Sequence, residues 1–132
     1  MPISIEVDLE SQLTIRRVKG TVTFDELIEL LKDPSEWNLT PYLLWDFREG
    51  SIKNFSSGEI QEIADMVSRV SVVSGYKKAA GVHPKDIDFG LGSMLHAYME
   101  IKGYKQTFKI FHEYEDAVTW LTGDETLLEK SA

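Results

Sequence analysis

Hydrophobic and polar residues alternate at the start of the chain. Ile3, Ile5 and Val7 alternate with polar residues, and a similar pattern runs from Leu13 to Val18. Alternation with a period of two is typical of a strand that buries one face. A short polar stretch separates the two runs, so we expect an antiparallel hairpin here.

Two later segments have the spacing of a capping box, in which a hydroxyl residue and a glutamate three residues later cap a helix. Thr23 with Glu26 predicts the start of a first helix, and Ser56 with Glu59 predicts the start of a second, longer one. Apolar residues then recur at helical spacing after each box.

A third helix is expected after the fourth strand, with Asp86 or Asp88 as its N-cap. Its buried stripe is expected to be Leu91, Met94, Leu95, Tyr98 and Ile101. The expected strands are 3–7, 13–18, 42–47, 78–82 and 107–111, and the expected helices are 24–33, 56–73, 86–102 and 113–121.

Strands that alternate with helices in the order ββαβαβαβα indicate an α/β fold with a mainly parallel, mixed sheet. The hairpin would add antiparallel pairing at one side of this sheet. We expect a single domain over 1–122 with four helices, followed by a C-terminal tail over 123–132.

Composition narrows the classes of partner. The 132 residues include 14 Lys and Arg and 22 Asp and Glu, a formal charge of -8 that opposes a nucleic-acid backbone. The chain has no cysteine, which excludes disulfides and thiolate metal sites. We see neither a signal peptide nor an apolar run long enough for a membrane span, and we expect a soluble cytoplasmic protein.

The order of elements, together with Leu44-Trp45-Asp46-Phe47 and the helix that opens at Ser56-Ser57-Gly58, resembles the STAS family of anti-sigma-factor antagonists. The segment 89–94, with two glycines, and the ending from Phe111 to Leu121 resemble the SpoIIAA-like branch of bacterial proteins. The resemblance implies a STAS-like domain that acts as a non-enzymatic regulatory or interaction module and binds a protein partner.

In the antagonists an Asp-Ser-Ser-Gly element carries a regulatory phosphoserine. On this sequence the element corresponds to Ser56, Ser57 and Gly58, with Phe55 in place of the aspartate. A phosphate at a helix N-terminus is stabilised by free N–H groups and the helix dipole. An ordinary cap also explains Ser56, with Glu59 as its partner. We take Ser56 to Glu59 as the candidate phospho-acceptor or partner surface.

A second candidate surface surrounds the start of the third helix. Gly90 and Gly92 destabilise a helix relative to alanine. We therefore expect a function or a close contact that explains why glycine occurs at these positions. The exposed backbone N–H groups at this helix N-terminus could bind an anion. Alternatively, the glycines allow close packing of the helix against the sheet or a neighbouring subunit. With Ser93, Asp46 and His83, these residues form the candidate ligand or anion surface.

An enzyme interpretation remains as a further alternative. Asp46, His83 and His112 follow or end predicted parallel strands, at the edge where α/β sheets usually bind ligands. Asp46 and His83 together with Ser56 would form a hydrolase set, although the sequence has no nucleophile-elbow motif. We expect no catalytic residue, cofactor or metal, and we expect His96 to face solvent.

A ligand-binding interpretation competes with the interaction module. The aromatic residues Trp37, Trp45 and Trp120 are candidates to line an apolar pocket, although core packing is their default role. Methionines on two helices would suit either such a pocket or a homodimer face. The chemical class of the ligand, apolar or anionic, stays open at this point.

Overall fold

The computed structural model describes residues 3–32, 40–74, 77–103 and 107–123. Its strands are β1 (Ile3–Asp8), β2 (Leu13–Thr21), β3 (Tyr42–Ser51), β4 (Lys78–Val82) and β5 (Thr107–Phe111). Its helices are α1 (Phe24–Leu31), α2 (Ser57–Ser74), α3 (Asp86–Ile101) and α4 (Tyr114–Val118), which continues into the π-helical turn η2 (Thr119–Gly123). The predicted order ββαβαβαβα is confirmed.

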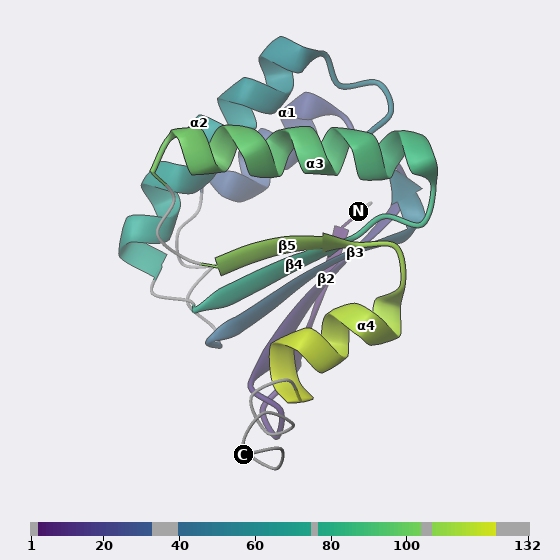
Figure 1. The fold of residues 1–132 in the computed structure, drawn as a ribbon, viewed down its shortest axis with the longest axis vertical. Coiled ribbons are helices and arrows are strands. Elements are labelled where there is room, and N and C mark those ends of the chain that lie inside the picture. Colours follow the sequence, from purple (N-terminus) through teal and green to yellow (C-terminus); the bar gives the residue numbers. More distant parts are fainter. Residues whose placement is uncertain (1–2, 33–39, 75–76, 104–106, 124–132) are drawn as a thin grey trace.

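The strands form one mixed sheet in the order β1-β2-β3-β4-β5. The first pair is antiparallel and the other three pairs are parallel, as the sequence predicts. Helices α1, α2 and α3 cover one face of the sheet, and α4 covers the other (Figure 1). Each of these three helices therefore connects neighbouring parallel strands across the same face.

Alternation along the central strands divides the core into two apolar clusters. Leu43 and Ala79 point into the cluster beneath α1, α2 and α3, whereas Leu44 and Ala80 point into the cluster beneath α4. All four side chains are buried because both faces of β3 and β4 are covered. The small residues of β4 allow the helices to approach the sheet closely.

Both predicted capping boxes are present. The Thr23 hydroxyl accepts from the backbone N–H of Glu26 (3.2 Å), and the Glu26 carboxylate accepts from the Thr23 N–H (2.9 Å). At α2 the Ser56 hydroxyl accepts from Glu59 N–H (3.1 Å), and the Glu59 carboxylate accepts from Ser56 N–H (2.9 Å). These local signals fix where α1 and α2 begin.

Helix α3 departs from the prediction in two respects. Its N-cap is Lys85, which makes no side-chain capping bond, so the expected cap by Asp86 or Asp88 is wrong. Ile101 is 77% exposed, whereas Met99 is buried. Packing against β5 and α2 selects a stripe that ends at Met99.

Other predictions fall outside the described residues. These include Trp37 and most of the proposed tail, so the domain boundary at residue 122 stays a prediction. Within the described ranges, no helix combines the length and apolar character needed to cross a bilayer.

Candidate functional site

A cavity of about 60 Å³ lies between the sheet and helices α1, α2 and α3. Its wall is mainly apolar, with Leu31 from α1, Ile60 from α2, Met99 from α3 and Trp45 from β3 among the lining residues. Protein interiors usually contain few voids larger than a water molecule. This cavity is therefore a candidate binding site.

His83, directly after β4, brings an imidazole to this apolar wall. The residue is only 4% exposed, and its ring stacks on Phe47 with centroids 4.5 Å apart. Its Nδ1 atom is buried and has no hydrogen-bond partner among the described residues. Burial lowers the pKa of His83 to about 4, although the charge of Asp88 partly opposes the shift.

The lowered pKa predicts a loss of stability in mild acid. The unfolded chain protonates His83 near pH 6.5, whereas the folded chain resists protonation until about pH 4. Its unfolded state therefore binds more protons as the pH falls through this window. Integrated over the window, this difference lowers the free energy of unfolding by about 2 kcal/mol between pH 7.5 and pH 5.

Urea denaturation at a series of pH values measures this effect, with His83→Leu as the control. The variant lacks the imidazole, so between pH 7.5 and pH 5 its free energy of unfolding should fall by about 2 kcal/mol less than that of the wild-type protein. An equal pH dependence in both proteins would contradict the assignment to His83.

Asp88 is a second buried polar residue beside this site, with a role that was not predicted from the sequence. Its Oδ1 accepts hydrogen bonds from the Ser51 hydroxyl (2.9 Å) and from the backbone N–H of Ile52 (3.0 Å). Its Oδ2 is buried without a partner among the described residues. The carboxylate therefore joins the first turn of α3 to the end of β3 and places a negative charge near His83.

Asp46 lies on the opposite side of the sheet, in the layer beneath α4. Alternation along β3 puts Asp46 on the same face as Leu44, which belongs to the α4 cluster. Arg48 binds its carboxylate with two side-chain nitrogens, at 3.0 and 2.9 Å, and also stacks on Tyr114 of α4. Arg17 completes the ion cluster, with its Nε 3.4 Å from Asp46 Oδ2.

This cluster offsets the charge of Asp46. Burial would raise the pKa of Asp46, but the hydrogen bonds from Arg48 and the charges of Arg48 and Arg17 hold it below its usual value. The cluster borders a polar hollow of about 300 Å³. Its contacts show a structural role, because Arg48 links β3 to α4.

The structure does not bring together the residues of the alternative hydrolase interpretation. β3 continues to Ser51, so Asp46 lies within the strand and not at its end. Asp46 pairs in register with Val82, and the next residue, His83, lines the cavity on the other face. The sheet therefore separates the carboxylate from the imidazole.

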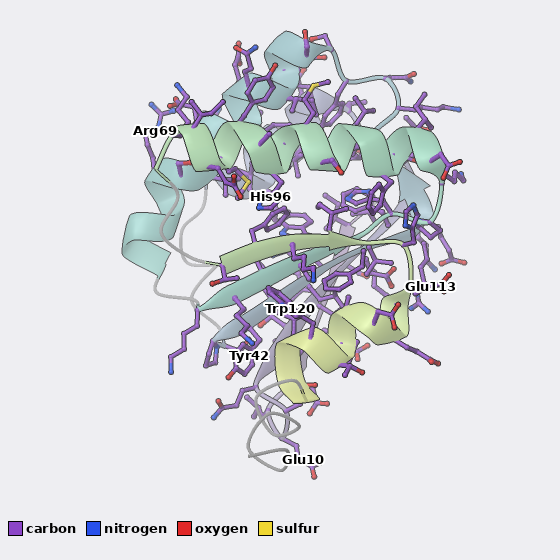
Figure 2. All side chains as sticks on the ribbon, viewed as in Figure 1. Glu10, Tyr42, Arg69, His96, Glu113 and Trp120 are labelled. Atoms are coloured by element: carbon purple, nitrogen blue, oxygen red, sulfur yellow. The ribbon has the colours of Figure 1, made fainter. Side chains whose placement is uncertain are left out.

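The other histidines make separate contacts. His112 stacks on Phe89 with centroids 3.7 Å apart. His96 is half-buried and its ring tilts against Phe108 at 5.6 Å, so the expectation that it faces solvent is wrong. Figure 2 shows His96 on the side of α3 that faces the sheet, while Trp120 lies on the α4 side. Trp120 therefore packs in the other layer, away from Trp45 and the cavity.

The residues proposed as a partner surface lie together at the start of α2. Ser56, Ser57 and Gly58 are exposed, and a side chain at Gly58 would meet only the Ser56 hydroxyl, at 3.9 Å. Phe55, one residue earlier, is buried and forms part of the cavity wall. The exposed surface and the cavity thus adjoin through the backbone between Phe55 and Ser56.

The glycine-rich start of α3 is divided between two environments. A Cβ at Gly92 would lie 3.1 Å from the His83 ring, so this glycine permits close packing of α3. A Cβ at Gly90 would meet no atom within 4 Å, and both Gly90 and Ser93 are exposed. The role of Gly90 and Ser93 in anion binding stays a prediction.

No group of three His, Asp or Glu side chains within the described ranges is arranged to hold a metal ion. Besides the contacts of Asp88, the pairing of Arg48 with Asp46 was not predicted from the sequence. An arginine two residues after a buried aspartate on a strand was the available signal, since both side chains point to one face.

Two solved structures are similar to this chain. One is an anti-sigma factor antagonist from Mycobacterium paratuberculosis, with 16% identity, coverage of 90% of this chain and 93% of that chain, and a TM-score of 0.48. The other is the STAS domain of an antisigma-factor antagonist from Rhodobacter sphaeroides, with 9% identity, coverage of 83% of each chain and a TM-score of 0.34.

No family model and no curated protein matches the sequence. The likeness to the two solved structures concerns the fold alone.

Proposed function

We propose that this chain is a non-enzymatic binding module that takes a small, mainly apolar molecule into the cavity beneath α1, α2 and α3. The observation that carries this proposal is the apolar void of about 60 Å³. A single water needs roughly 10–15 Å³, and an engineered cavity of about 150 Å³ binds benzene. The cavity therefore suits a molecule between these sizes.

Energetics also favour an occupant. Apolar wall atoms that face an unfilled hollow lack contact partners on that side and lose dispersion energy there. A molecule with apolar surface would recover part of this energy through contacts with the wall. The described residues that line the wall include no lysine, arginine, aspartate or glutamate, which favours a neutral molecule over a charged one.

Xenon is a direct probe of this proposal. We expect dissolved xenon to shift the methyl NMR signals of cavity residues such as Leu31, Ile60 and Met99 and to leave the α4 layer unchanged. Ala79→Val should abolish these shifts, because the added methyl groups fill the cavity. Absence of xenon-dependent shifts in the wild-type protein would contradict the proposal.

Ala80→Val is the matched control for this experiment. Ala80 neighbours Ala79 on β4 and is equally buried, but it points into the α4 cluster. Xenon shifts should therefore persist in Ala80→Val. If both valine variants lost them equally, general disturbance of the sheet would explain the result and the cavity assignment would fail.

A second candidate function is protein binding at the start of α2, in the manner of the anti-sigma-factor antagonists that the sequence resembles. The exposed Ser56 hydroxyl at a helix N-terminus supports it, since phosphate is stabilised in that position. Phe55 would couple the two functions, because it both lines the cavity and precedes this surface.

Phosphorylation provides the test of this second function. After incubation with cell lysate and ATP, mass spectrometry should find phosphate on Ser56 or Ser57. Thr23 is an internal control, because it has the same capping-box geometry on α1. Equal modification of Thr23, or none at the serines, would leave Ser56 as a cap whose replacement by alanine costs about 1 kcal/mol.

A further inference from the structure

The imidazole of His83 is held in one place from several sides. Phe47 stacks on one side of the ring, with 20° between the two planes. A Cβ at either Gly81 or Gly92 would lie 3.1 Å from a ring atom, so both glycines leave room for the imidazole. The ring is thus fixed by β3, β4 and α3 at the wall of the cavity.

This fixed polar group has an unmet requirement for hydrogen bonding. Nδ1 of His83 and Oδ2 of Asp88 are both buried, and neither has a partner among the described residues. An unpaired buried polar atom costs about 1–3 kcal/mol, so such atoms are rare and call for an explanation. A leucine in place of His83 would avoid this cost if the wall served only packing.

We propose that the molecule bound in the cavity carries a hydroxyl group that hydrogen bonds to the imidazole of His83, and that the ligand class is a small neutral alcohol. The inference rests on the proposed binding function and adds the polar group of the ligand. Its apolar part contacts residues such as Ile60 and Met99, and its hydroxyl faces the end of β4.

Three chemical arguments favour a hydroxyl group. A neutral imidazole has one donor and one acceptor nitrogen, and a hydroxyl satisfies either because it both donates and accepts. A carboxylate would meet the nearby negative charge of Asp88, and none of the described residues that line the wall is a lysine or an arginine. A pure hydrocarbon would leave the His83 nitrogen without a partner.

Ethanol and ethanethiol form a suitable pair of probes, since they have the same carbon skeleton and differ in one heavy atom, and the thiol is a much weaker hydrogen-bond donor. NMR titration of each probe gives its affinity for wild-type protein and for His83→Leu. We expect the variant to bind ethanol about five- to tenfold more weakly, as expected for one hydrogen bond. Its affinity for ethanethiol should stay within twofold.

His83→Asn serves as the rescue variant, because its amide places a polar atom near the position of Nδ1. We expect this variant to restore most of the affinity for ethanol. In wild-type protein, ethanol should also shift the ¹⁵N NMR resonance of a His83 ring nitrogen. This measurement requires no substitution and reports the hydrogen bond directly.

The outcomes separate this inference from the proposed function. One result would overturn the hydroxyl inference while the binding function stands. In that result xenon and ethanethiol bind, but His83→Leu binds ethanol as tightly as the wild-type protein and ethanol leaves the His83 ¹⁵N resonance unshifted. If neither xenon nor either probe enters the wild-type cavity, both fail. Loss of ethanol affinity in His83→Leu with rescue in His83→Asn supports the inference.

Discussion

Replacing Asp88 by alanine should lower the free energy of unfolding by about 3 kcal/mol, because two hydrogen bonds to a buried carboxylate are lost. The residue is 1% exposed, and its Oδ1 accepts from both the Ser51 hydroxyl and the Ile52 N–H. Alanine would leave the Ile52 N–H buried without its acceptor. Urea denaturation should give this value, and the melting temperature should fall by about 10 °C.

Two variants control for the position and the charge. Asp88→Asn retains an acceptor oxygen, so it should lose only about 1 kcal/mol. Asp86→Ala removes an exposed carboxylate from the same helical turn and should change stability by less than about 0.5 kcal/mol. If Asp88→Ala behaved like Asp86→Ala, the link between α3 and the end of β3 would have no energetic role.

Asp88 also shows where sequence reasoning stops. An aspartate in the first turn of a helix is a common cap, and the capping prediction was reasonable locally. The same kind of signal succeeds at Thr23 and Ser56, because both partners of each capping box lie within four residues. The partners of Asp88 lie in another element, so only the folded structure reveals them.

The order of elements could be predicted for a related reason. Hydrophobic periodicity and helix caps are local, and a run of strand and helix units permits few topologies. The contents of the site depend on register. Pairing of Asp46 with Val82 puts His83 on the face opposite Asp46, and this register is not written in either strand alone.

The cavity could not be predicted for a further reason. Its apolar wall residues resemble ordinary core residues in the sequence, and packing against three helices decides whether a void remains. The sequence makes Trp45 and Trp120 candidates for one pocket, but in the structure they belong to different layers. The number of aromatic residues therefore indicates a core without indicating its shape.

The junction of β2 and β3 leads to the second large expected effect. Gly50 is buried on β3 and pairs with Gly20, beside an irregularity of register between Arg17 and Lys19. A Cβ at Gly50 would lie 2.6 Å from the carbonyl oxygen of Val18 and 2.8 Å from its side chain. Even alanine therefore cannot fit without moving the backbone of β2.

We expect Gly50→Ala to lower the free energy of unfolding by about 3 kcal/mol, at the upper end of usual overpacking costs because the obstacle is backbone. Gly90→Ala is the matched control. Its Cβ would meet no atom within 4 Å, so replacing this helical glycine should raise stability by about 1 kcal/mol. Parallel urea denaturation of both variants measures the two effects.

Opposite signs for these two glycine variants would follow from their surroundings, since the same methyl group is added in each. Val18 belongs to the core beneath α1, α2 and α3, so a shift of β2 at Gly50 would also disturb the packing on the side of the sheet that holds the cavity. Gly50→Ala should therefore weaken xenon binding, whereas Gly90→Ala should not. A stable Gly50→Ala protein with normal xenon binding would show that β2 does not approach β3 as closely as this packing requires.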